Sequence, residues 1–132
     1  MKLVMAHGCF DVLHYGHMLH LRQARRMGDR LLVSLTDDEF VNKPGRPIFN
    51  VHQRVAMLRA LRCVDDVAVS RAATASDSIR RYCPAVFIKG ADYDFKAINK
   101  DEMEACAHVG ARIWFTNTEK FSTTEILRRL SQ

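Results

Sequence analysis

The chain has 132 residues, of which 48% are hydrophobic, and a formal net charge of +5. This length allows one buried core and is too short for two ordinary domains, so we expect a single domain over residues 1–132. No stretch approaches the roughly 18 to 20 consecutive apolar residues of a membrane span, and the N-terminus turns polar before a signal peptide could form, so we expect a soluble cytoplasmic protein without a membrane partner.

The positive charge is spread in short groups, such as Arg25 with Arg26 and Arg80 with Arg81, rather than in one dense basic tract. No interleaved aromatic platform accompanies it, so we expect no nucleic-acid partner, whereas an anionic small substrate suits this charge. The four cysteines form no CxxC pair. Neither a disulfide framework nor a zinc site is therefore indicated.

Short apolar runs alternate with helical patterns along the whole chain. The predicted strands cover residues 2–6, 31–35, 67–69, 85–88 and 112–115. One helix is predicted between the first two strands, and others over about 51–62, 75–82, 98–109 and 123–130, with a long irregular loop at 42–49. Apolar strands separated by helices predict a doubly wound, Rossmann-like α/β fold with a five-stranded parallel sheet and helices on both faces.

The stretch HGCFDVLHYGH at residues 7–17 occupies the loop after the first strand, the usual phosphate site of such folds. Gly8 allows a tight turn after the strand, and Gly16 lets a ligand approach the helix start without meeting a Cβ. His14 and His17 are three residues apart, so both imidazoles can face one side of a helix that begins just after His14. The N–H groups and positive dipole end of that helix attract phosphate. A lone histidine is more often a surface or core residue, but this spacing at this place predicts a phosphate pocket.

The pattern GxFDxxHxGH at 8–17 resembles the signature of the cytidylyltransferase-like nucleotidyltransferases, and the similarity extends to the C-terminal helix. TDDEF followed by Lys43, and RCVDDV from Arg62, resemble glycerol-3-phosphate cytidylyltransferases. IKGADY at 88–93 is closer to the adenylyltransferase part of bacterial ADP-heptose synthases. FSTTEI at 121–126 resembles the STT motif that both groups carry before the last helix.

The resemblance implies a reaction in which a phosphate oxygen of an acceptor attacks the α-phosphorus of CTP or ATP, and pyrophosphate leaves. The implied acceptor is a small phosphorylated sugar or polyol, and the implied cofactor is Mg²⁺. Positioning and charge stabilisation account for most of such catalysis, and no side-chain nucleophile is required. Small members of the family usually pair, so we also expect a homodimer with residues 50–70 available for the contact. A nucleotide-binding regulatory module without turnover is the alternative.

The resemblance also implies roles for the matching residues. The predicted catalytic residues, which would stabilise the α-phosphate or reach over the triphosphate, are His14, His17 and Lys43. The predicted nucleotide-binding residues are Gly8, Cys9, Phe10, Gly16, Lys89, Gly90, Asp92, Ser122, Thr123 and Thr124. The predicted substrate-binding residues are Asp11, Arg54 and Arg62. Outside the motif, replacement should leave turnover nearly unchanged for His20, His52 and His108.

Three of these residues also have a plainer alternative. Lys43 fits a solvated loop lysine. Ser122 fits a helix N-cap, with Glu125 completing a capping box, and a cap and a phosphate seat can share one helix end. Asp11 fits a turn cap as well as a water-mediated contact to magnesium.

Arg54 and Arg62 are eight residues apart and share roughly one face of the predicted helix 51–62. By resemblance they face the triphosphate or the phosphate of the second substrate, and a pair of exposed helix arginines is the alternative. The sequence departs from the family in NTEKFSTT, where Asn117 stands in place of the arginine of RTEGISTT. Because a charged contact to the nucleotide is then absent, we expect no strict selection of CTP. Recognition of the nucleotide base would then depend on backbone groups near Gly8 and around residues 88–93.

Overall fold

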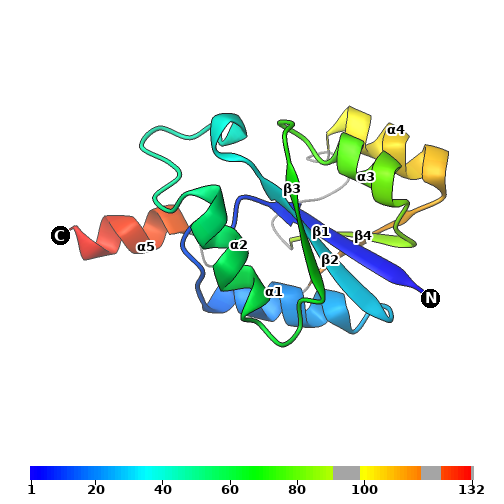
Figure 1. Ribbon diagram of the computed structural model, residues 1–132, viewed down its shortest axis with the longest axis horizontal. Coiled ribbons are helices and arrows are strands. Elements are labelled where there is room, and N and C mark those ends of the chain that lie inside the picture. The colour runs from blue at the N-terminus through cyan, green and yellow to red at the C-terminus, as the bar shows by residue number, and fades with distance from the viewer. Residues whose placement is uncertain (91–98, 117–122, 132) are drawn as a thin grey trace.

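The computed structural model describes residues 1–90, 99–116 and 123–131, with the backbone alone at 123–126. Within these residues a parallel sheet has the strand order β3-β2-β1-β4-β5 (Figure 1). The strands are β1 (Leu3–Gly8), β2 (Arg30–Thr36), β3 (Asp66–Ser70), β4 (Val86–Lys89) and β5 (Arg112–Phe115). The helices are α1 (Tyr15–Arg25), α2 (Val51–Arg59), α3 (Ser76–Tyr82), α4 (Lys100–Val109) and α5 (Thr123–Leu130), with a 3₁₀-helix at Asp38–Phe40 that the sequence pattern did not predict.

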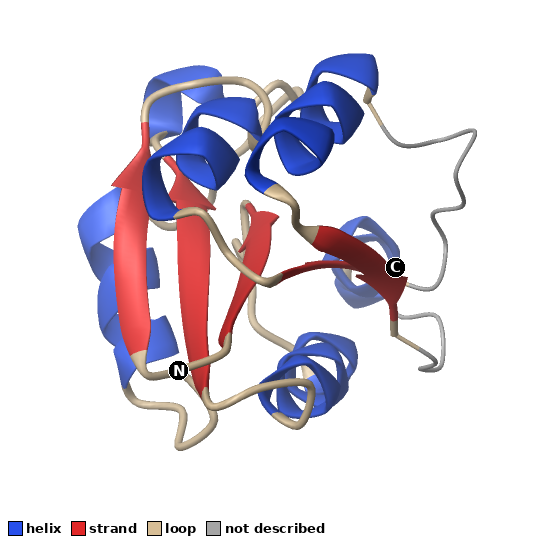
Figure 2. Ribbon diagram, turned by 90° about the vertical axis from the view of Figure 1, so that its right-hand side faces the viewer, coloured by secondary structure: helices blue, strands red, loops and turns tan. Residues whose placement is uncertain are grey.

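Helices cover both faces of the sheet (Figures 1 and 2). Successive side chains of a strand point to opposite faces. In β1, Val4 therefore joins the core beneath α1 and α2, which includes Leu21 and Leu58. Met5 joins the core beneath α3 and α4, which includes Ile79. The predicted doubly wound α/β fold with five parallel strands is confirmed.

Two element ends differ from the prediction in ways that affect the site. β1 continues through His7 to Gly8, because its pairing with β2 extends to Gly8 opposite Leu35. α2 ends at Arg59, since the following amides bond to carbonyls three residues back, as Leu61 does to Leu58. Arg62 therefore lies in the turn before β3, beyond the helix that was predicted to carry it.

The strand order reverses between β1 and β4, and in open α/β sheets ligands bind beyond the carboxyl ends of the strands at such a point. The carboxyl ends lie on the side of the molecule where α2 begins and α5 lies, away from the N-terminus (Figure 1). The start of α1 follows directly from the end of β1 on this side. The fold thus brings the motif at residues 7–17 to the expected place.

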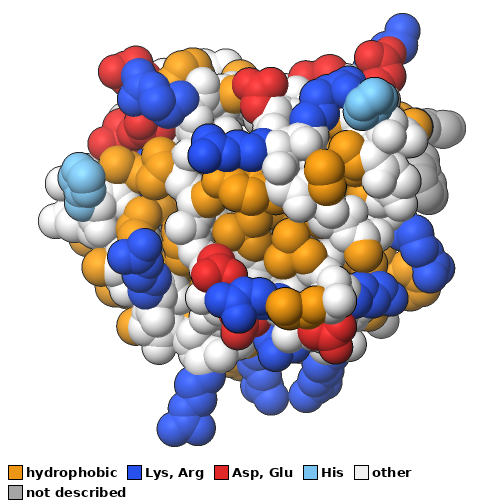
Figure 3. Space-filling model, turned by 45° about the vertical axis from the view of Figure 1, so that its right-hand side comes forward, with side chains coloured by type: hydrophobic (Ala, Val, Ile, Leu, Met, Phe, Trp, Pro, Cys, Tyr) orange, Lys and Arg blue, Asp and Glu red, His pale blue; other side chains and the backbone are white. Residues whose placement is uncertain are grey.

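Basic side chains lie among apolar and acidic ones on the face drawn in Figure 3, and several project from its lower margin. Exposed carboxylates neutralise part of this charge. Arg30 lies 2.6 Å from Asp66, and Arg71 lies 2.6 Å from Asp37. Within the three described ranges, no helix has the length and apolar character needed to cross a bilayer.

Candidate functional site

The two motif histidines form the start of α1. His14 is the N-cap residue, and its Nδ1 accepts a hydrogen bond from the Gly16 N–H at 3.1 Å. The His17 Nδ1 accepts in turn from the His14 N–H at 3.3 Å, so the two imidazoles make a capping box. The rings stack with centroids 3.8 Å apart and planes 22° apart. As the spacing predicted, the pair lies together at the helix end.

These hydrogen bonds determine where each ring carries its proton. A neutral imidazole has one donor and one acceptor nitrogen, and both Nδ1 atoms accept, so both protons lie on Nε2. Burial lowers the pKa of His14. Burial, with electrostatic contributions in the same direction from His14, His20, Arg46 and Lys43, lowers the pKa of His17 to about 3. At neutral pH each ring of the pair therefore carries an Nε2–H donor, that of His14 being buried, and the pair has no positive charge of its own.

The turn between β1 and α1 supports the pair. Phe10 has a left-handed backbone with φ of 46°, and its ring meets the His17 ring edge-on with centroids 5.3 Å apart. A Cβ on Gly8 would lie 3.0 Å from the Phe10 ring, so this glycine leaves space for that ring. The residue that makes the sharp turn is therefore Phe10, and the reason for Gly8 differs from the predicted one. Phe10 is buried, so its side chain supports His17 and does not face the open surface.

Asp11 fastens the 42–49 loop to the motif. Its carboxylate accepts hydrogen bonds from the Phe49 N–H at 2.9 Å, the Ile48 N–H at 2.7 Å and the Arg46 Nε. Burial alone would raise the pKa of Asp11, but these hydrogen bonds hold it below its usual range. The side chain is fully buried against these donors, which fits the alternative of a turn cap, and the predicted substrate contact of Asp11 stays a prediction.

Arg54 is only 1% exposed and binds the protein with its whole guanidinium group. Nε donates to the Phe49 carbonyl at 2.9 Å, and one terminal nitrogen donates to the carbonyls of Thr36 at 2.7 Å and Cys9 at 2.9 Å. The other terminal nitrogen lies 2.7 Å from an Asp38 oxygen. The alternative of an exposed helix arginine is therefore wrong for Arg54, whereas its predicted phosphate contact stays a prediction. Cys9 takes part through its carbonyl, which faces Arg54.

Arg62 is exposed. It lines a cavity of about 500 Å³ together with Met18, Arg22, Arg25, Arg26, Leu61 and Cys63. The arginines of this cavity come from the far end of α1, about two turns beyond His14. Arg62 does not share a helix face with Arg54, because α2 ends at Arg59, and its predicted substrate contact stays a prediction.

Lys43 lies in an exposed turn in which the Arg46 N–H donates to the Lys43 carbonyl at 3.1 Å. The turn faces α5, because Leu127 lines a cavity of about 350 Å³ with residues 43–46 and Ile48. Lys43 also contributes to the low pKa of His17, so its ammonium group is within electrostatic reach of the pair. This position is compatible with the predicted phosphate contact and with a solvated lysine.

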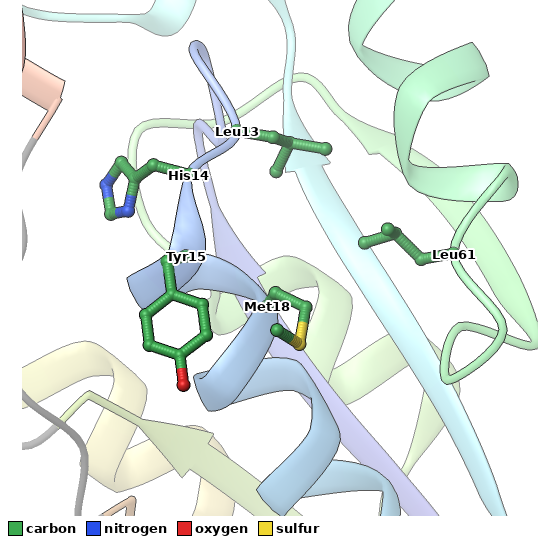
Figure 4. Close-up of a pocket in the computed structure, with 5 residues that line it drawn as sticks. All are labelled: Leu13, His14, Tyr15, Met18 and Leu61. Carbon is green, nitrogen blue, oxygen red and sulfur yellow. The ribbon is translucent and has the colours of Figure 1, made fainter.

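An apolar hollow of about 320 Å³ adjoins the pair and is lined by Leu13, His14, Tyr15, Met18 and Leu61. Leu13, Met18 and Leu61 point into the space between α1 and the chain after α2, whereas the His14 ring points to the other side (Figure 4). The hollow therefore lies beside the histidine pair and offers few polar groups to a phosphate.

The Lys89 side chain is directed into the protein. Its Nζ lies 2.9 Å from a Glu102 oxygen, and it is 14% exposed. The other Glu102 oxygen accepts from the Ala75 N–H at 2.8 Å, which ties α4 to the start of α3. The predicted nucleotide contact of Lys89 stays a prediction, and through the side chain it would have to compete with this ion pair. A contact through the backbone at Gly90 stays a prediction.

One contact near the pair was missed from the sequence. His20 Nδ1 lies 2.8 Å from Thr116 Oγ1, although the two residues are 96 positions apart. The spacing of His14, His17 and His20, three residues each, is the one sequence signal that could have indicated it.

Several predicted site residues cannot be placed. Asp92 and Ser122, with Asn117, lie outside the described residues. Thr123 and Thr124 begin α5, but their side chains lie outside the described part of the structure as well.

The residues present do not fit a protein-bound Mg²⁺. In residues 1–90, 99–116 and the described part of α5, no group of three or more His, Cys, Asp or Glu could hold a metal ion. Asp11, the carboxylate considered for this role, faces Arg46 and two backbone N–H groups. A cation there would meet donors in place of oxygen ligands, so we assign no step to magnesium.

Known proteins share both the sequence and the fold. The bifunctional protein HldE of Pseudomonas fluorescens strain Pf0-1 is 39% identical over 133 residues, and HldE of Pseudomonas entomophila strain L48 is 39% identical over 132 residues. These matches cover 98% and 97% of this chain but 28% of each relative, so the chain spans about 28% of the length of these relatives.

Solved structures agree with this relationship. The lipopolysaccharide core biosynthesis protein from Thermoplasma volcanium GSS1 superposes with a TM-score of 0.73 at 27% identity, over 92% of this chain and 99% of that one. TmcAL from Thermotoga maritima, solved with alpha-thio ATP, has a TM-score of 0.70 at 15% identity, over 99% of this chain and 50% of that one, and so shows the fold alone. The model of the Cytidylyltransferase-like family matches residues 5–129. With the motif at the start of α1 and this match over nearly the whole chain, the protein belongs to the Cytidylyltransferase-like family.

Proposed function

We propose that the protein is a nucleotidyltransferase that transfers a nucleoside monophosphate from ATP or CTP to a small phosphorylated sugar or polyol and releases pyrophosphate. The observation that supports this most is the stacked pair of His14 and His17 at the start of α1. It provides two neutral Nε2–H donors beside the positive end of a helix, which suits a phosphate group. Membership in the Cytidylyltransferase-like family supports the same reaction class.

In the proposed reaction, an oxygen of the acceptor phosphate forms a bond to the α-phosphorus. The bond from that phosphorus to the oxygen bridging the β-phosphorus breaks, and its electron pair leaves with pyrophosphate. Negative charge develops on the other α-phosphate oxygens, where preorganised donors lower the barrier. His14 and His17 would serve as these donors without transferring a proton.

The triphosphate needs further positive charge, and the 42–49 loop can supply it. Lys43 is exposed at the tip of this loop, and Asp11 anchors the loop end at Ile48 and Phe49. Leu127 of α5 lies across a cavity from this loop. We propose that Lys43 contacts the triphosphate from one side and the N–H groups of α5 from the other. Mg²⁺ is proposed as a counter-ion that arrives with the nucleotide.

We propose that ATP is accepted as well as CTP, and that the acceptor is heptose-phosphate-like, with a glycerol-3-phosphate-like compound as the second choice. The KGADY stretch and the missing arginine at Asn117 support this nucleotide choice. Similarity to HldE and to a lipopolysaccharide core biosynthesis protein supports a place in cell-envelope polysaccharide synthesis.

Pyrophosphate release tests the proposal. ATP and CTP are each mixed with a panel of sugar and polyol phosphates, and release should require both a nucleotide and an acceptor. Each nucleotide without an acceptor is the control. Nucleotide binding without release from any pair would overturn the transferase and favour the regulatory module.

A further inference from the structure

Thr116 joins three elements at the carboxyl end of the sheet. It follows β5 directly, is 4% exposed, and its N–H donates to the Lys89 carbonyl at the end of β4 at 3.0 Å. Its Oγ1 lies 2.8 Å from His20 Nδ1 on α1 and 3.4 Å from the same Lys89 carbonyl. The threonine therefore connects the ends of β4 and β5 to the helix that carries the histidine pair.

His20 lies one turn after His17 on the same helix face and is close enough to contribute to the low pKa of His17. Its ring lies between two parts of the site. One is the helix start that presents the Nε2–H donors. The other is the end of β4, where Gly90 was predicted to meet the nucleotide.

The contact changes the expectation from the sequence that replacing His20 leaves turnover nearly unchanged. We propose that His20 is a positioning residue, which acts through Thr116 to hold the ends of β4 and β5 in register with His14 and His17. The inference rests on the proposed function, because it concerns how a bound nucleotide is aligned with the pair. The reacting phosphorus must lie against the histidines while the nucleoside is held at another element. A misplacement of about 1 Å can cost roughly a hundredfold in rate.

The contact should matter more for turnover than for stability. One partly buried hydrogen bond contributes little to the free energy of folding. The contacts to the nucleotide themselves stay intact when it is lost. A variant without the contact should therefore fold and bind nucleotide, and should fail mainly in alignment.

Three variants distinguish the effect of side-chain volume at His20 and Thr116 from the effect of the hydrogen-bonding atom. His20→Leu removes the hydrogen bond and keeps much of the volume, whereas His20→Asn keeps a polar atom at the position of Nδ1. Thr116→Val removes the hydroxyl and keeps the shape. His108→Leu, at an exposed position of α4, is the matched control.

We expect His20→Leu and Thr116→Val each to lower kcat about tenfold or more and to leave the nucleotide Kd from calorimetry within about threefold. The double variant should lose no more than the single ones, because both remove the same contact. His20→Asn should recover most of the loss, and His108→Leu should match the wild type. A folded His20→Leu enzyme with wild-type kcat, or a double variant that loses the product of the two single effects, overturns the inference.

A second readout separates this inference from the proposed function. If the wild type binds ATP or CTP but releases no pyrophosphate, the transferase proposal fails. The His17 imidazole resonance then decides the inference. A nucleotide-induced shift that is present in the wild type and lost in His20→Leu supports the positioning role, and the same shift in both proteins overturns it. A wild type that binds neither nucleotide overturns both.

Discussion

Arg54 and Arg62 are the same residue type, eight positions apart, and lie in opposite surroundings. Arg54 is buried with protein acceptors at each of its nitrogens, whereas Arg62 is exposed in a turn. A lysine cannot reproduce the fixed fork of a guanidinium group. We expect Arg54→Lys to lower the free energy of unfolding by about 2 to 4 kcal/mol, because buried carbonyls lose their donors.

The matched substitution Arg62→Lys should change the free energy of unfolding by less than about 0.5 kcal/mol. Urea denaturation of both variants measures the difference. Equal stabilities would show that the buried hydrogen bonds of Arg54 are not formed in solution.

The two ring nitrogens of His17 have different roles, which substitutions can separate. Its Nδ1 caps the helix start by accepting from the His14 N–H, and its Nε2 is left as a donor. His17→Asn keeps an acceptor near the position of Nδ1 and removes Nε2, so it should preserve the helix start. We expect kcat to fall about a hundred- to thousandfold, as for the loss of one preorganised donor.

His17→Ala removes both tasks and should lose a similar rate together with about 1 kcal/mol of stability. Initial rates and thermal melts of both variants are compared with His52→Ala, at an exposed position of α2. Near wild-type kcat in His17→Asn would show that the ring acts only as a cap.

The 42–49 loop works as one unit because the Asp11 carboxylate fixes its end. Asp11→Ala would release Ile48 and Phe49 and so loosen the position of Lys43. We expect Asp11→Ala and Lys43→Ala each to raise the KM for the nucleotide. Their double variant should add little, since both act through the same ammonium group.

Steady-state kinetics of the four proteins, with Glu39→Ala as an exposed control carboxylate, measures this coupling. If the increase in KM of the double variant equals the product of the two single increases, Asp11 and Lys43 act independently.

The sequence predicts the elements that depend on local signals. α1 begins where the spacing of its two histidines indicated, because the cap is made within four residues. The strands were found because they are continuously apolar. The end of α2 was missed, since Leu61 continues the apolar pattern after the backbone has changed its hydrogen bonding.

The surroundings of charged side chains could not be read from local spacing. Arg54 is held by carbonyls from three other segments, at Cys9, Thr36 and Phe49, and only the fold brings these together. The same holds for Lys89, whose partner comes from α4. Spacing therefore predicted that the two histidines lie together at the start of α1, but not the buried protein partners of Asp11, Arg54 and Lys89.

For the whole molecule, one side of the sheet is suited to pairing. β3 is the edge strand next to α2, and it exposes Val69 by 46%, while Met57 on α2 is 51% exposed. We expect a homodimer through residues 50–70, with Met57→Glu shifting it to monomer because a charge would be buried at the contact.

Sedimentation at micromolar concentration measures the mass of each protein. Met103→Glu, at a 38% exposed position of α4 on the other side of the sheet, should leave the dimer intact. A clean monomer mass for the wild type removes this prediction.

Because of the histidine capping box, the solvent exchange of the Gly16 amide reports whether the His14 ring is charged. The Gly16 N–H donates to His14 Nδ1, and a proton that arrives on this nitrogen takes away the acceptor. The pKa of His14 lies below its ordinary 6.5, so the amide should stay protected from solvent exchange at pH 7 and lose protection as the pH falls. Exchange measured by NMR, normalised for the intrinsic effect of pH and compared with the Leu21 amide in mid-helix, would show this. A protection factor that stays flat while the His14 ring resonance titrates would contradict it. A bound anion that favours the charged ring should move the loss to higher pH. The state of the pair can thus be followed without any substrate turnover.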